Sequence, residues 1–224
     1  MNGLYISLDG ADGVGKTTLV KMLADALREK KQKVTTTRQP GDSNSNISMK
    51  IRDLVLDPCN EMKPFTNEVL FLADMVENLS SIVSPALGKG DTVITDRGLL
   101  THYAYAHAKE VSYVALENAY IAFSNIIGCI PDITFIIIRP IEDHLKTFHE
   151  KSQSQTPDRM EREGFGFQKK VIDYFDTLIR LRANQKSIYL GEWLYTKEII
   201  PIENFSLDQA LKDMLNILNE HFNL

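Results

Sequence analysis

One segment near the start of the chain has the residue types and spacing to hold a chain of phosphates. Residues 10–18 read GADGVGKTT, which contains Gly-x-x-x-x-Gly-Lys-Thr, directly after an apolar run at residues 4–8. Glycines let successive backbone N–H groups turn inward, and the helix that follows adds the positive end of its dipole. Lys16 is then placed to reach the β- and γ-phosphates of a nucleotide, and the Thr17 hydroxyl to ligate Mg²⁺. The segment predicts a P-loop.

We assign the nucleotide phosphates to the whole loop rather than to one side chain. Strand-like residues precede the loop and a helical pattern follows it, which disfavours the alternative of a glycine-rich turn without a ligand. The residues assigned to ATP are Gly10, Asp12, Gly13, Val14, Gly15, Lys16, Thr17 and Thr18.

Two charged clusters each follow a predicted strand. Residues 37–42, TRQPGD, include Arg38, whose planar guanidinium suits a phosphate. Residues 95–97, TDR, place Asp96 to hold a Mg²⁺-bound water and Arg97 to face the phosphate under attack. Either cluster alone would be a surface ion pair by default. Because an open α/β sheet binds its ligand at the carboxyl ends of its strands, the two clusters together predict a second phosphate site beside the P-loop.

A polar segment late in the chain has no apolar period. Residues 150–163 read EKSQSQTPDRMERE, with one proline. The composition predicts a mobile surface segment, and two interpretations stay open: a solvated loop, or a lid that closes over a phosphate-transfer site.

Strand-length apolar runs alternate with helix-length periodic segments. This alternation is typical of an α/β fold with helices on both faces of a mostly parallel, five-stranded sheet. We see no repeat and no linker, so the whole of 1–224 is expected to form a single domain. Strands are predicted near 4–9, 34–37, 92–95, 132–138 and 197–202. Helices are predicted near 17–30, 47–56, 66–87, 111–128, 141–150, 163–184 and 206–222.

Composition narrows the class of protein. The 224-residue chain has 43% hydrophobic residues and a formal net charge of -5, which argues against binding to nucleic acid. No apolar run approaches the length of a membrane span, and no basic-then-apolar leader is present at the start, so we expect no membrane partner. Cys59 and Cys129 lack metal-like spacing and fit a reducing compartment, which favours the cytoplasm.

Taken in order, the motifs resemble those of thymidylate kinases, small P-loop enzymes that move the ATP γ-phosphoryl group onto a deoxynucleoside monophosphate. TRQPG resembles the family's TREPG, LFLADM resembles LLFxADR, and PALGKGDTVITDR resembles PALxxGxxVxxDRY. AY at 104–105 matches a later pair, PDITFIII is similar to PDLTxYLDV, and DRMERE is similar to the lid's DRFExE. The resemblance spans most of the chain and implies a three-layer P-loop kinase fold with a short lid at about 150–163.

The resemblance also implies roles for individual residues. Arg38 and Arg97 would bind the acceptor monophosphate, and Asp12 would accept a hydrogen bond from the sugar 3'-hydroxyl or help to order the metal. Phe71 would stack on the base, with a place in the helix core as its rival interpretation. Thr17 and Asp96 would hold Mg²⁺. The remaining residues assigned to the acceptor are Met75, Gly98, Thr101 and Tyr105.

Catalytic positive charge is expected from three side chains. Some family members carry an arginine within the phosphate loop, but residue 13 is glycine here. The missing charge would have to come from the lid, with Arg159 as the first candidate and Arg162 as the second. The expected catalytic set is therefore Lys16, Arg97 and Arg159.

Three departures bear on the base. Met75 stands where the family usually has an arginine that hydrogen-bonds thymine, Ala106 replaces a common glutamine, and Gly98 replaces the tyrosine of DRY. Apolar contacts discriminate less than buried polar groups, so these changes suggest a roomier, more apolar pocket. The expected acceptor is dTMP, with a different or 5-modified deoxynucleoside monophosphate as the alternative. Outside the enzyme class, the alternatives are a nucleotide-controlled switch and a nucleotide-binding paralogue with little kinase activity.

The resemblance further implies a homodimer. Its contact would run through the helices predicted near 47–87 and 111–128.

Overall fold

The computed structural model describes residues 3–112, 114–115, 118–119, 122, 129–144, 146, 158–183 and 198–224. Its centre is a five-stranded sheet with the strand order β2-β3-β1-β4-β5. The strands are β1 (Tyr5–Asp9), β2 (Val34–Arg38), β3 (Thr92–Asp96), β4 (Ile133–Ile138) and β5 (Glu198–Glu203). Each begins and ends within one residue of its predicted position.

Every strand pairing is parallel. β1 lies between β3 and β4, with Tyr5 opposite Val93 and Ile6 opposite Ile133. All residues of β1 and β3 are buried, which agrees with strands that are covered by helices on both faces. Parallel register brings the carboxyl ends of β1, β2 and β3 to one edge of the sheet, and Arg38 is opposite Asp96 there.

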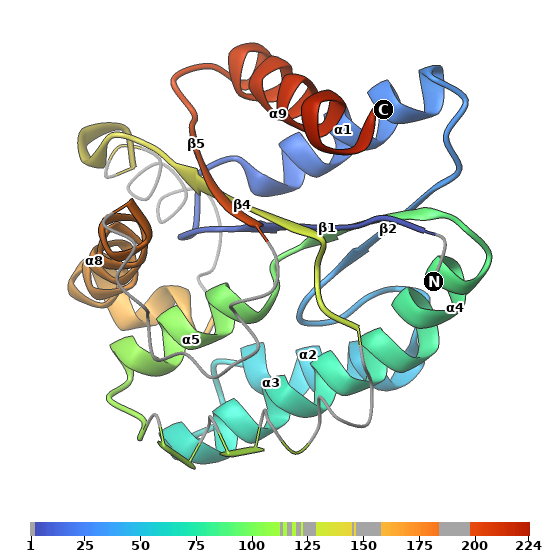
Figure 1. Ribbon diagram of the computed structural model, residues 1–224. Coiled ribbons are helices and arrows are strands. Elements are labelled where there is room, and N and C mark those ends of the chain that lie inside the picture. The colour runs from blue at the N-terminus through green and yellow to red at the C-terminus, as the bar shows by residue number, and fades with distance from the viewer. Residues whose placement is uncertain are drawn as a thin grey trace.

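The helices form the outer layers. Figure 1 shows α1 (Lys16–Glu29) and α9 (Leu207–Phe222) on one face of the sheet, and α2 (Asn46–Leu56), α3 (Pro64–Asn78) and α5 (Leu99–Ala108) on the other. The π-helix at Leu79–Val83 joins α3 to α4 (Ser84–Gly88), so the predicted helix at 66–87 is three successive elements. A 3-10 turn at Glu161–Glu163 precedes α8 (Gly164–Ala183). The arrangement is a three-layer α/β fold with a parallel sheet between two layers of helices.

Apolar stripes hold the first face together. Leu19, Leu23 and Leu27 of α1 are fully buried, as the period of the segment predicts. α9 packs against α1 with Met214 and Leu218, which are also fully buried. Each such side chain contributes roughly 1.5–3 kcal/mol through its removal from water.

α5 was not predicted from the sequence. Its residues LLTHYAYAHA are buried on nearly every side, since Leu100, Tyr103, Ala104 and Ala106 are all inaccessible. α5 contacts α3, α8 and β1, and only His107 among its described side chains is exposed, so it shows little 3.6-residue alternation of polar and apolar residues. Of the helix predicted at 111–128, the described residues 114–115, 118–119 and 122 are helical, and of that predicted at 141–150, residues 141–144 and 146 are helical. The other residues of 141–150, and most of 111–128, lie outside the described residues.

The continuous helical run Pro64–Gly88 is long and apolar enough to cross a membrane by length and composition, contrary to the expectation that no such run exists. In its most apolar window, with a mean hydropathy of 1.2, 39% of the residues are buried within the protein. The run also carries Glu68, Asp74 and Asn78, which are fully buried against other parts of the fold. A single helix that meets these criteria is weak evidence for a membrane span.

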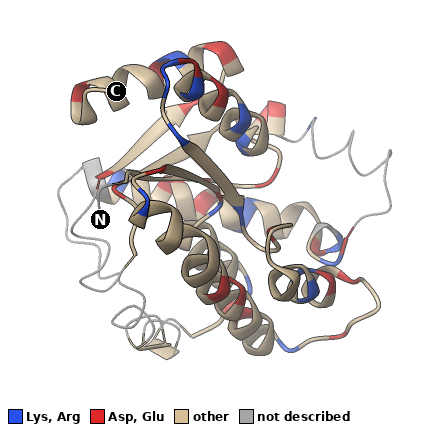
Figure 2. Ribbon diagram, turned by 90° about the vertical axis from the view of Figure 1, so that its right-hand side faces the viewer, with Lys and Arg blue, Asp and Glu red and all other residues tan. Residues whose placement is uncertain are grey.

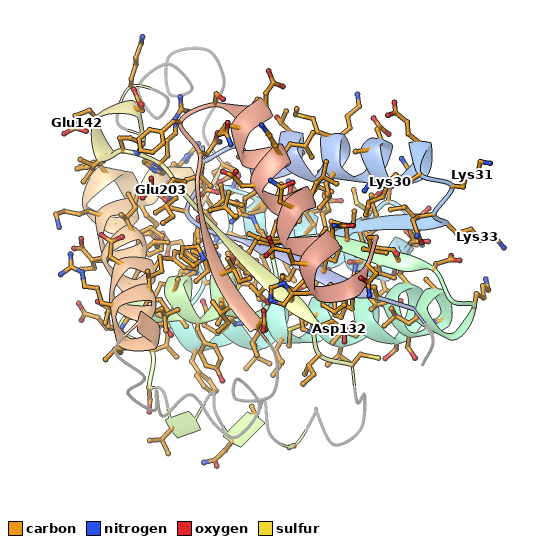
Figure 3. The ribbon with its side chains drawn as sticks, turned by 45° about the horizontal axis from the view of Figure 1, so that its top comes forward. Lys30, Lys31, Lys33, Asp132, Glu142 and Glu203 are labelled. Carbon is orange, nitrogen blue, oxygen red and sulfur yellow. The ribbon has the colours of Figure 1, made fainter. Side chains whose placement is uncertain are left out.

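Charged residues of both signs are spread over the outer helices (Figure 2). Lys30, Lys31 and Lys33 lie together where α1 leads into β2 (Figure 3). These lysines precede the amino end of β2, whereas Arg38 is at its carboxyl end. The lysine cluster is therefore at the opposite edge of the sheet from the charged groups that the sequence assigns to phosphate.

Candidate active site

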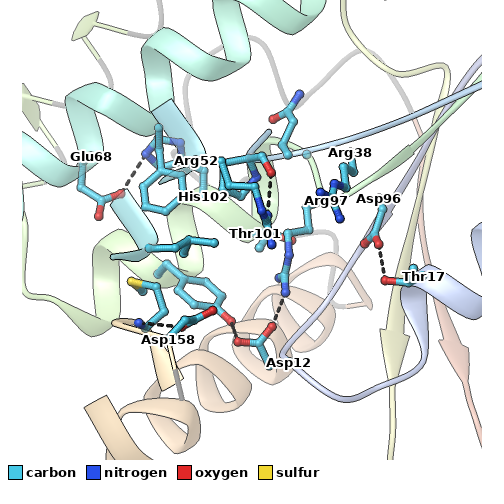
Figure 4. Close-up of a pocket in the computed structure, with 17 residues that line it drawn as sticks. Asp12, Thr17, Arg38, Arg52, Glu68, Asp96, Arg97, Thr101, His102 and Asp158 are labelled. Carbon is cyan, nitrogen blue, oxygen red and sulfur yellow. Dashed lines mark hydrogen bonds and ion pairs between the residues drawn. The ribbon is translucent and has the colours of Figure 1, made fainter. Parts of the chain in front are cut away.

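A cavity of about 240 Å³ opens at the carboxyl edge of the sheet (Figure 4). The P-loop and α1 contribute Asp12 and Thr17 to its wall, and the ends of β2 and β3 contribute Arg38, Asp96 and Arg97. Helices α3 and α5 close the other end. The structure thus brings both charged clusters to one cavity with the start of α1, as the sequence predicts.

The P-loop takes the curled form that its glycines permit. Gly13 and Gly15 have φ angles of 82° and 96°, in the region that disfavours residues with a side chain. A Cβ atom on Gly15 would also lie 2.7 Å from the side-chain nitrogen of Asn204. That nitrogen donates a 2.6 Å hydrogen bond to the carbonyl of Val14. The loop is therefore fixed from β1 on one side and from the segment after β5 on the other.

Lys16 lies beneath the loop and is 4% exposed. Its Nζ donates hydrogen bonds to the carbonyls of Gly10 at 2.9 Å and Ala11 at 2.5 Å. Burial, together with the positive charge of Arg97, lowers the pKa of Lys16 to about 7. An anion placed beside the ammonium group favours its charged form. Lys16 does not itself line the cavity, whereas its neighbour Thr17 does.

Thr17 and Asp96 have the chemistry of a magnesium site. The Thr17 hydroxyl donates to Oδ2 of Asp96, and Oδ1 of Asp96 is buried without a hydrogen-bond partner in the described part of the chain. The described residues hold no group of three or more His, Cys, Asp or Glu side chains suited to a metal. Mg²⁺ commonly binds one or two protein oxygens together with phosphates and water. The two side chains therefore fit Mg²⁺ that arrives with a nucleotide.

Asp12 is the centre of a hydrogen-bonded cluster. It pairs with Nη2 of Arg97 (Figure 4). It also accepts hydrogen bonds from the Tyr105 hydroxyl at 2.6 Å and from Gln168 at 3.2 Å. Burial raises the pKa of Asp12, but the charges of Arg97 and Lys16 outweigh it and hold that pKa far below its ordinary value. Asp12 is therefore ionised and fixes one side of the Arg97 guanidinium.

Arg97 is held in an uncommon backbone conformation. Its φ angle is 76°, a region that non-glycine residues rarely adopt. The carbonyl of Arg97 accepts a 2.8 Å hydrogen bond from Thr95, and its N–H donates to Leu8 at 2.9 Å. Its guanidinium lies 5.7 Å from the centre of the Tyr105 ring, and Nη1 is buried without a partner in the part of the chain that the structure describes. Local strain of this kind is typical of functional sites.

Arg38 is positioned by a loop that sequence reasoning left unexplained. Its Nε donates to the carbonyl of Gly41 at 2.8 Å, and the Gly41 N–H donates to the buried Asp74 at 3.0 Å. The peptide bond between residues 39 and 40 is cis. Asn78 donates a 2.5 Å hydrogen bond to the Thr37 hydroxyl. Two polar side chains of α3, Asp74 and Asn78, thus anchor the loop that carries Arg38.

A third arginine was missed by the sequence analysis. Arg52 of α2 lines the cavity and donates to the carbonyl of Pro40 at 2.8 Å. Burial and the charge of Arg38 lower the pKa of Arg52. Its position in the middle of an ordinary amphipathic helix gave no signal, because only the packing of α2 against the 39–42 loop brings it to the site.

The other residues assigned to the acceptor, taken with Ala106, separate into two groups. Phe71, Thr101, Tyr105 and Gly98 line the cavity. Thr101 is tied to the Asp9 carboxylate through its hydroxyl at 2.6 Å and its N–H at 2.8 Å. Met75 is 8% exposed and packs in the core instead, and Ala106 is fully buried there.

Gly98 is enclosed on one side by polar atoms. A Cβ atom there would lie 2.4 Å from Oγ of Ser7 and 3.1 Å from Oδ2 of Asp9. Ser7 donates to that same oxygen of Asp9 at 2.6 Å. The Ser7 hydroxyl therefore occupies the space that a side chain at residue 98 would need.

Arg159 does not reach the cavity in this structure. Its Nε donates to the carbonyl of Val55 at 2.8 Å, and its Nη2 donates to Oδ1 of Asn67. Its neighbours Asp158 and Met160 do line the cavity, and Arg162 is exposed. Residues 150–157 of the expected lid lie outside the described residues. The expected lid arginine is thus docked against the ends of α2 and α3.

The P-loop, the paired Thr17 and Asp96, and the facing arginines define a P-loop phosphotransferase. The family model described as thymidylate kinase matches residues 8–191. The thymidylate kinase of Halothermothrix orenii is 33% identical over 181 residues, covering 80% of this chain and 84% of its own. That of Chlorobium luteolum is 35% identical over 193 residues, covering 83% and 88%. That of Prochlorococcus marinus (strain SARG) is 31% identical over 222 residues, covering 92% and 97%.

The chain therefore belongs to the thymidylate kinase family, a family of nucleoside-monophosphate kinases. The resemblance drawn from the motifs is confirmed.

Proposed function

We propose that the protein transfers the γ-phosphoryl group of ATP to dTMP, giving ADP and the nucleoside diphosphate. The observation that supports this most directly is that Arg38 and Arg97 line the same cavity as Thr17 and Asp96. A nucleotide on the P-loop and a monophosphate on the arginines would meet end to end in that cavity. The names of the relatives supply dTMP as the acceptor.

In this proposal, catalysis comes from the alignment of the two nucleotides and from positive charge around the phosphoryl group being transferred. An acceptor phosphate oxygen is already a competent nucleophile, so no general base is required. Residues 10–18 bind the ATP phosphates, and the Lys16 ammonium moves from its loop carbonyls to the β- and γ-phosphates. Thr17 and Asp96 would hold Mg²⁺, which when bound neutralises phosphate charge.

Four residues hold the acceptor. Arg38 and Arg97 bind its phosphate, with the unpartnered Nη1 of Arg97 as one donor. The Asp12 carboxylate accepts from the sugar hydroxyl, and Tyr105 keeps that carboxylate in place at 2.6 Å. The base stacks on Phe71 at the far end of the cavity, a contact worth about 1–3 kcal/mol.

Arg159 is the proposed lid cation. Its guanidinium is hydrogen-bonded to Val55 and Asn67. These hydrogen bonds would have to break as the lid closes before Arg159 could contact the phosphoryl group being transferred. An enclosed, drier site would then strengthen the action of every cation in it.

We further propose a homodimer in the cytoplasm. Exposed apolar side chains gather on α2 and α3, where Ile47 is 52% and Leu54 44% exposed, and Phe65 is 47% and Val69 45% exposed. A second copy that covers this face would bury them. Analytical ultracentrifugation of the protein and of an Ile47→Glu variant tests this: the proposal requires a dimer that the variant weakens, and a monomeric wild type refutes it.

A coupled ADP-release assay tests the activity. ADP release from ATP and Mg²⁺ should depend on added dTMP, since a kinase needs its acceptor. Release without dTMP would identify a nucleotide-hydrolysing switch instead. Absence of release under both conditions, with ATP still bound, would identify a non-catalytic paralogue.

A further inference from the structure

A buried carboxylate stands at the junction between the P-loop and α5. Asp9 is the last residue of β1, is 1% exposed and does not line the cavity. Its Oδ1 accepts hydrogen bonds from the Gly98 N–H at 2.9 Å, the Thr101 N–H at 2.8 Å and the Thr101 hydroxyl at 2.6 Å. Its Oδ2 accepts one from the Ser7 hydroxyl at 2.6 Å. Neither phosphate binding nor the proposed catalysis uses this group.

These bonds make Asp9 the amino-terminal cap of α5. The first N–H groups of a helix lack partners within the helix, and the helix dipole favours a negative charge beside them. Gly98, the residue at the capping position, has no side chain with which to bond them. The missing cap is supplied by β1, from a residue 89 positions away in the chain. The start of α5 is thereby fixed to the carboxyl end of β1.

Both partners in this contact are chain neighbours of residues that the sequence assigns to phosphate. Gly10 comes directly after Asp9, begins the P-loop and accepts a 2.9 Å hydrogen bond from Lys16. Arg97 comes directly before Gly98, and its N–H donates to β1 at 2.9 Å. The spacing between the P-loop and the backbone of Arg97 is therefore set where Asp9 meets the start of α5.

The same contact positions a second part of the cavity wall. Thr101 and Tyr105 lie about one turn apart on α5, and both line the cavity. Tyr105 donates to the Asp12 carboxylate of the P-loop at 2.6 Å, so α5 meets the loop again at this point. A displacement of α5 relative to β1 would therefore move Arg97 and Tyr105 together with respect to the P-loop.

Stabilisation of the helix alone would not require a cap from β1. A Ser, Thr, Asp or Asn at residue 98 would cap α5 locally, as most helices are capped. Gly98 instead leaves room for the distant carboxylate, since a Cβ atom there would lie 3.1 Å from Oδ2 of Asp9. A local cap stabilises a helix wherever the helix lies. A cap from β1 stabilises α5 only in one position relative to the P-loop.

We propose that Asp9 is a positioning residue for phosphoryl transfer. By capping α5 from the end of β1, it sets the separation between the nucleotide on the P-loop and the acceptor held by Arg97. This inference rests on the proposed function. Transfer requires the reacting atoms to be held about 3–3.5 Å apart, and a misplacement of about 1 Å can lower the rate about 100-fold. Asp9 therefore acts on the step that needs both substrates together, and not on the binding of either one alone.

The test removes the cap and measures each substrate alone and then both together. In Asp9→Ala, kcat for ADP release with dTMP should fall by about 10- to 100-fold, while the separate calorimetric Kd values for ATP with Mg²⁺ and for dTMP stay within about threefold of the wild type. The Kd for a bisubstrate analogue, in which adenosine and thymidine are joined through five phosphates, should rise about tenfold or more, because this molecule occupies both sites at once.

Matched variants separate positioning from stability. Asp9→Asn keeps an oxygen for the donors of α5, and the Ser7 hydroxyl can accept from its amide, so kcat and the bisubstrate Kd should largely recover. Asp132→Ala removes a carboxylate that accepts the Tyr5 N–H at 2.7 Å at the other end of β1, and it should lower the free energy of unfolding without changing kcat or the bisubstrate Kd. If Asp9→Ala does not fold, Asp9→Ser replaces it with the same expectation, because the shorter side chain cannot reach every donor.

An unchanged kcat and bisubstrate Kd in a folded Asp9→Ala protein would overturn the inference. Loss of affinity for one substrate alone would also overturn it, since Asp9 would then belong to the site of that substrate. Equal losses in Asp132→Ala would leave Asp9 with a structural role only. A wild type that binds the bisubstrate analogue tightly but releases no ADP would refute the proposed function, and the effect of Asp9→Ala on that Kd would still decide the role of Asp9.

Discussion

Replacing Arg97 by lysine separates the charge of this residue from its geometry. The guanidinium uses Nη2 to pair with Asp12, and its buried Nη1 is unpartnered among the described residues and is assigned here to the acceptor phosphate. A lysine keeps one positive charge and can still pair with Asp12. It lacks the second donor in the fixed plane that a phosphate requires.

The expected loss follows from one charge-assisted hydrogen bond. Such a bond contributes about 1.5–3 kcal/mol, which corresponds to about a 10- to 150-fold decrease in kcat/KM for the acceptor. The side chains of Arg97 and Asp12 are 24% and 25% exposed, so solvent weakens this interaction only in part. The KM for ATP should change little, because the P-loop residues are intact.

Steady-state kinetics with dTMP varied at saturating ATP, and the converse, measure both quantities. Arg28→Lys is the matched control, since Arg28 pairs with Asp25 at 3.1 Å on an exposed face of α1. A kcat/KM for dTMP within threefold of the wild type in a folded Arg97→Lys protein would refute the assignment of Nη1 to the acceptor. An equal rise in the KM for ATP would show that the substitution had disturbed the whole cavity.

Three further substitutions test other parts of the site. Lys16→Met should lower kcat in the ADP-release assay on the order of 10²- to 10³-fold, and near-normal turnover would exclude a role for the ammonium. Gly98→Ala should lower the free energy of unfolding by about 1–3 kcal/mol, measured by chemical denaturation, because the new Cβ displaces the Ser7 hydroxyl. In a Ser7→Ala background the same substitution should have little effect. Additive losses from the two substitutions would contradict this account. Glu68 has a folded-state pKa of about 2, below its ordinary 4.5, so its stabilisation is full above pH 5 and is lost as the pH falls towards 2. His102 and Lys109 face the Glu68 carboxylate. Between pH 6 and pH 3 the unfolding free energy of the wild type should therefore fall by about 2 kcal/mol more than that of Glu68→Gln. Parallel plots of unfolding free energy against pH for the two proteins would argue against a buried anion.

The sheet and the phosphate loop could be predicted because their causes are local. Glycines at 13 and 15 adopt the positive φ angles that the motif requires, and the apolar runs of β1 and β3 are buried as continuous strands. The carboxyl ends of parallel strands share one edge, so Arg38 and Asp96 could be placed together without knowledge of the packing. Local sequence and sheet topology were therefore sufficient to predict the phosphate-binding end of the site.

The base end depends on packing and could not be predicted. Met75 and Phe71 are four residues apart on α3 and so lie on the same face of the helix, one turn apart. The packing around each turn decides that Phe71 lines the cavity while Met75 is enclosed in the core. Glu68 and His102, which also line the cavity, were missed for the same reason. α5 carries no alternation of polar and apolar residues, so the helix and its contribution to the cavity had no visible period.

Arg159 shows a different limit. Its place in a DRMERE segment indicates a lid, but a motif does not say where a long side chain docks. The structure records the position against Val55 and Asn67. Its role as the catalytic lid cation stays a prediction.

The hydrogen bond from Asn204 to Val14 joins two points of the chain that are 190 positions apart. A ribosome builds the nucleotide loop within the first 18 residues, yet Asn204, which holds the loop, is translated only after all five strands of the sheet. During synthesis the loop therefore exists for most of the time without its brace. The nascent chain should therefore bind nucleotide tightly only late in synthesis, after β5 has joined the edge of the sheet.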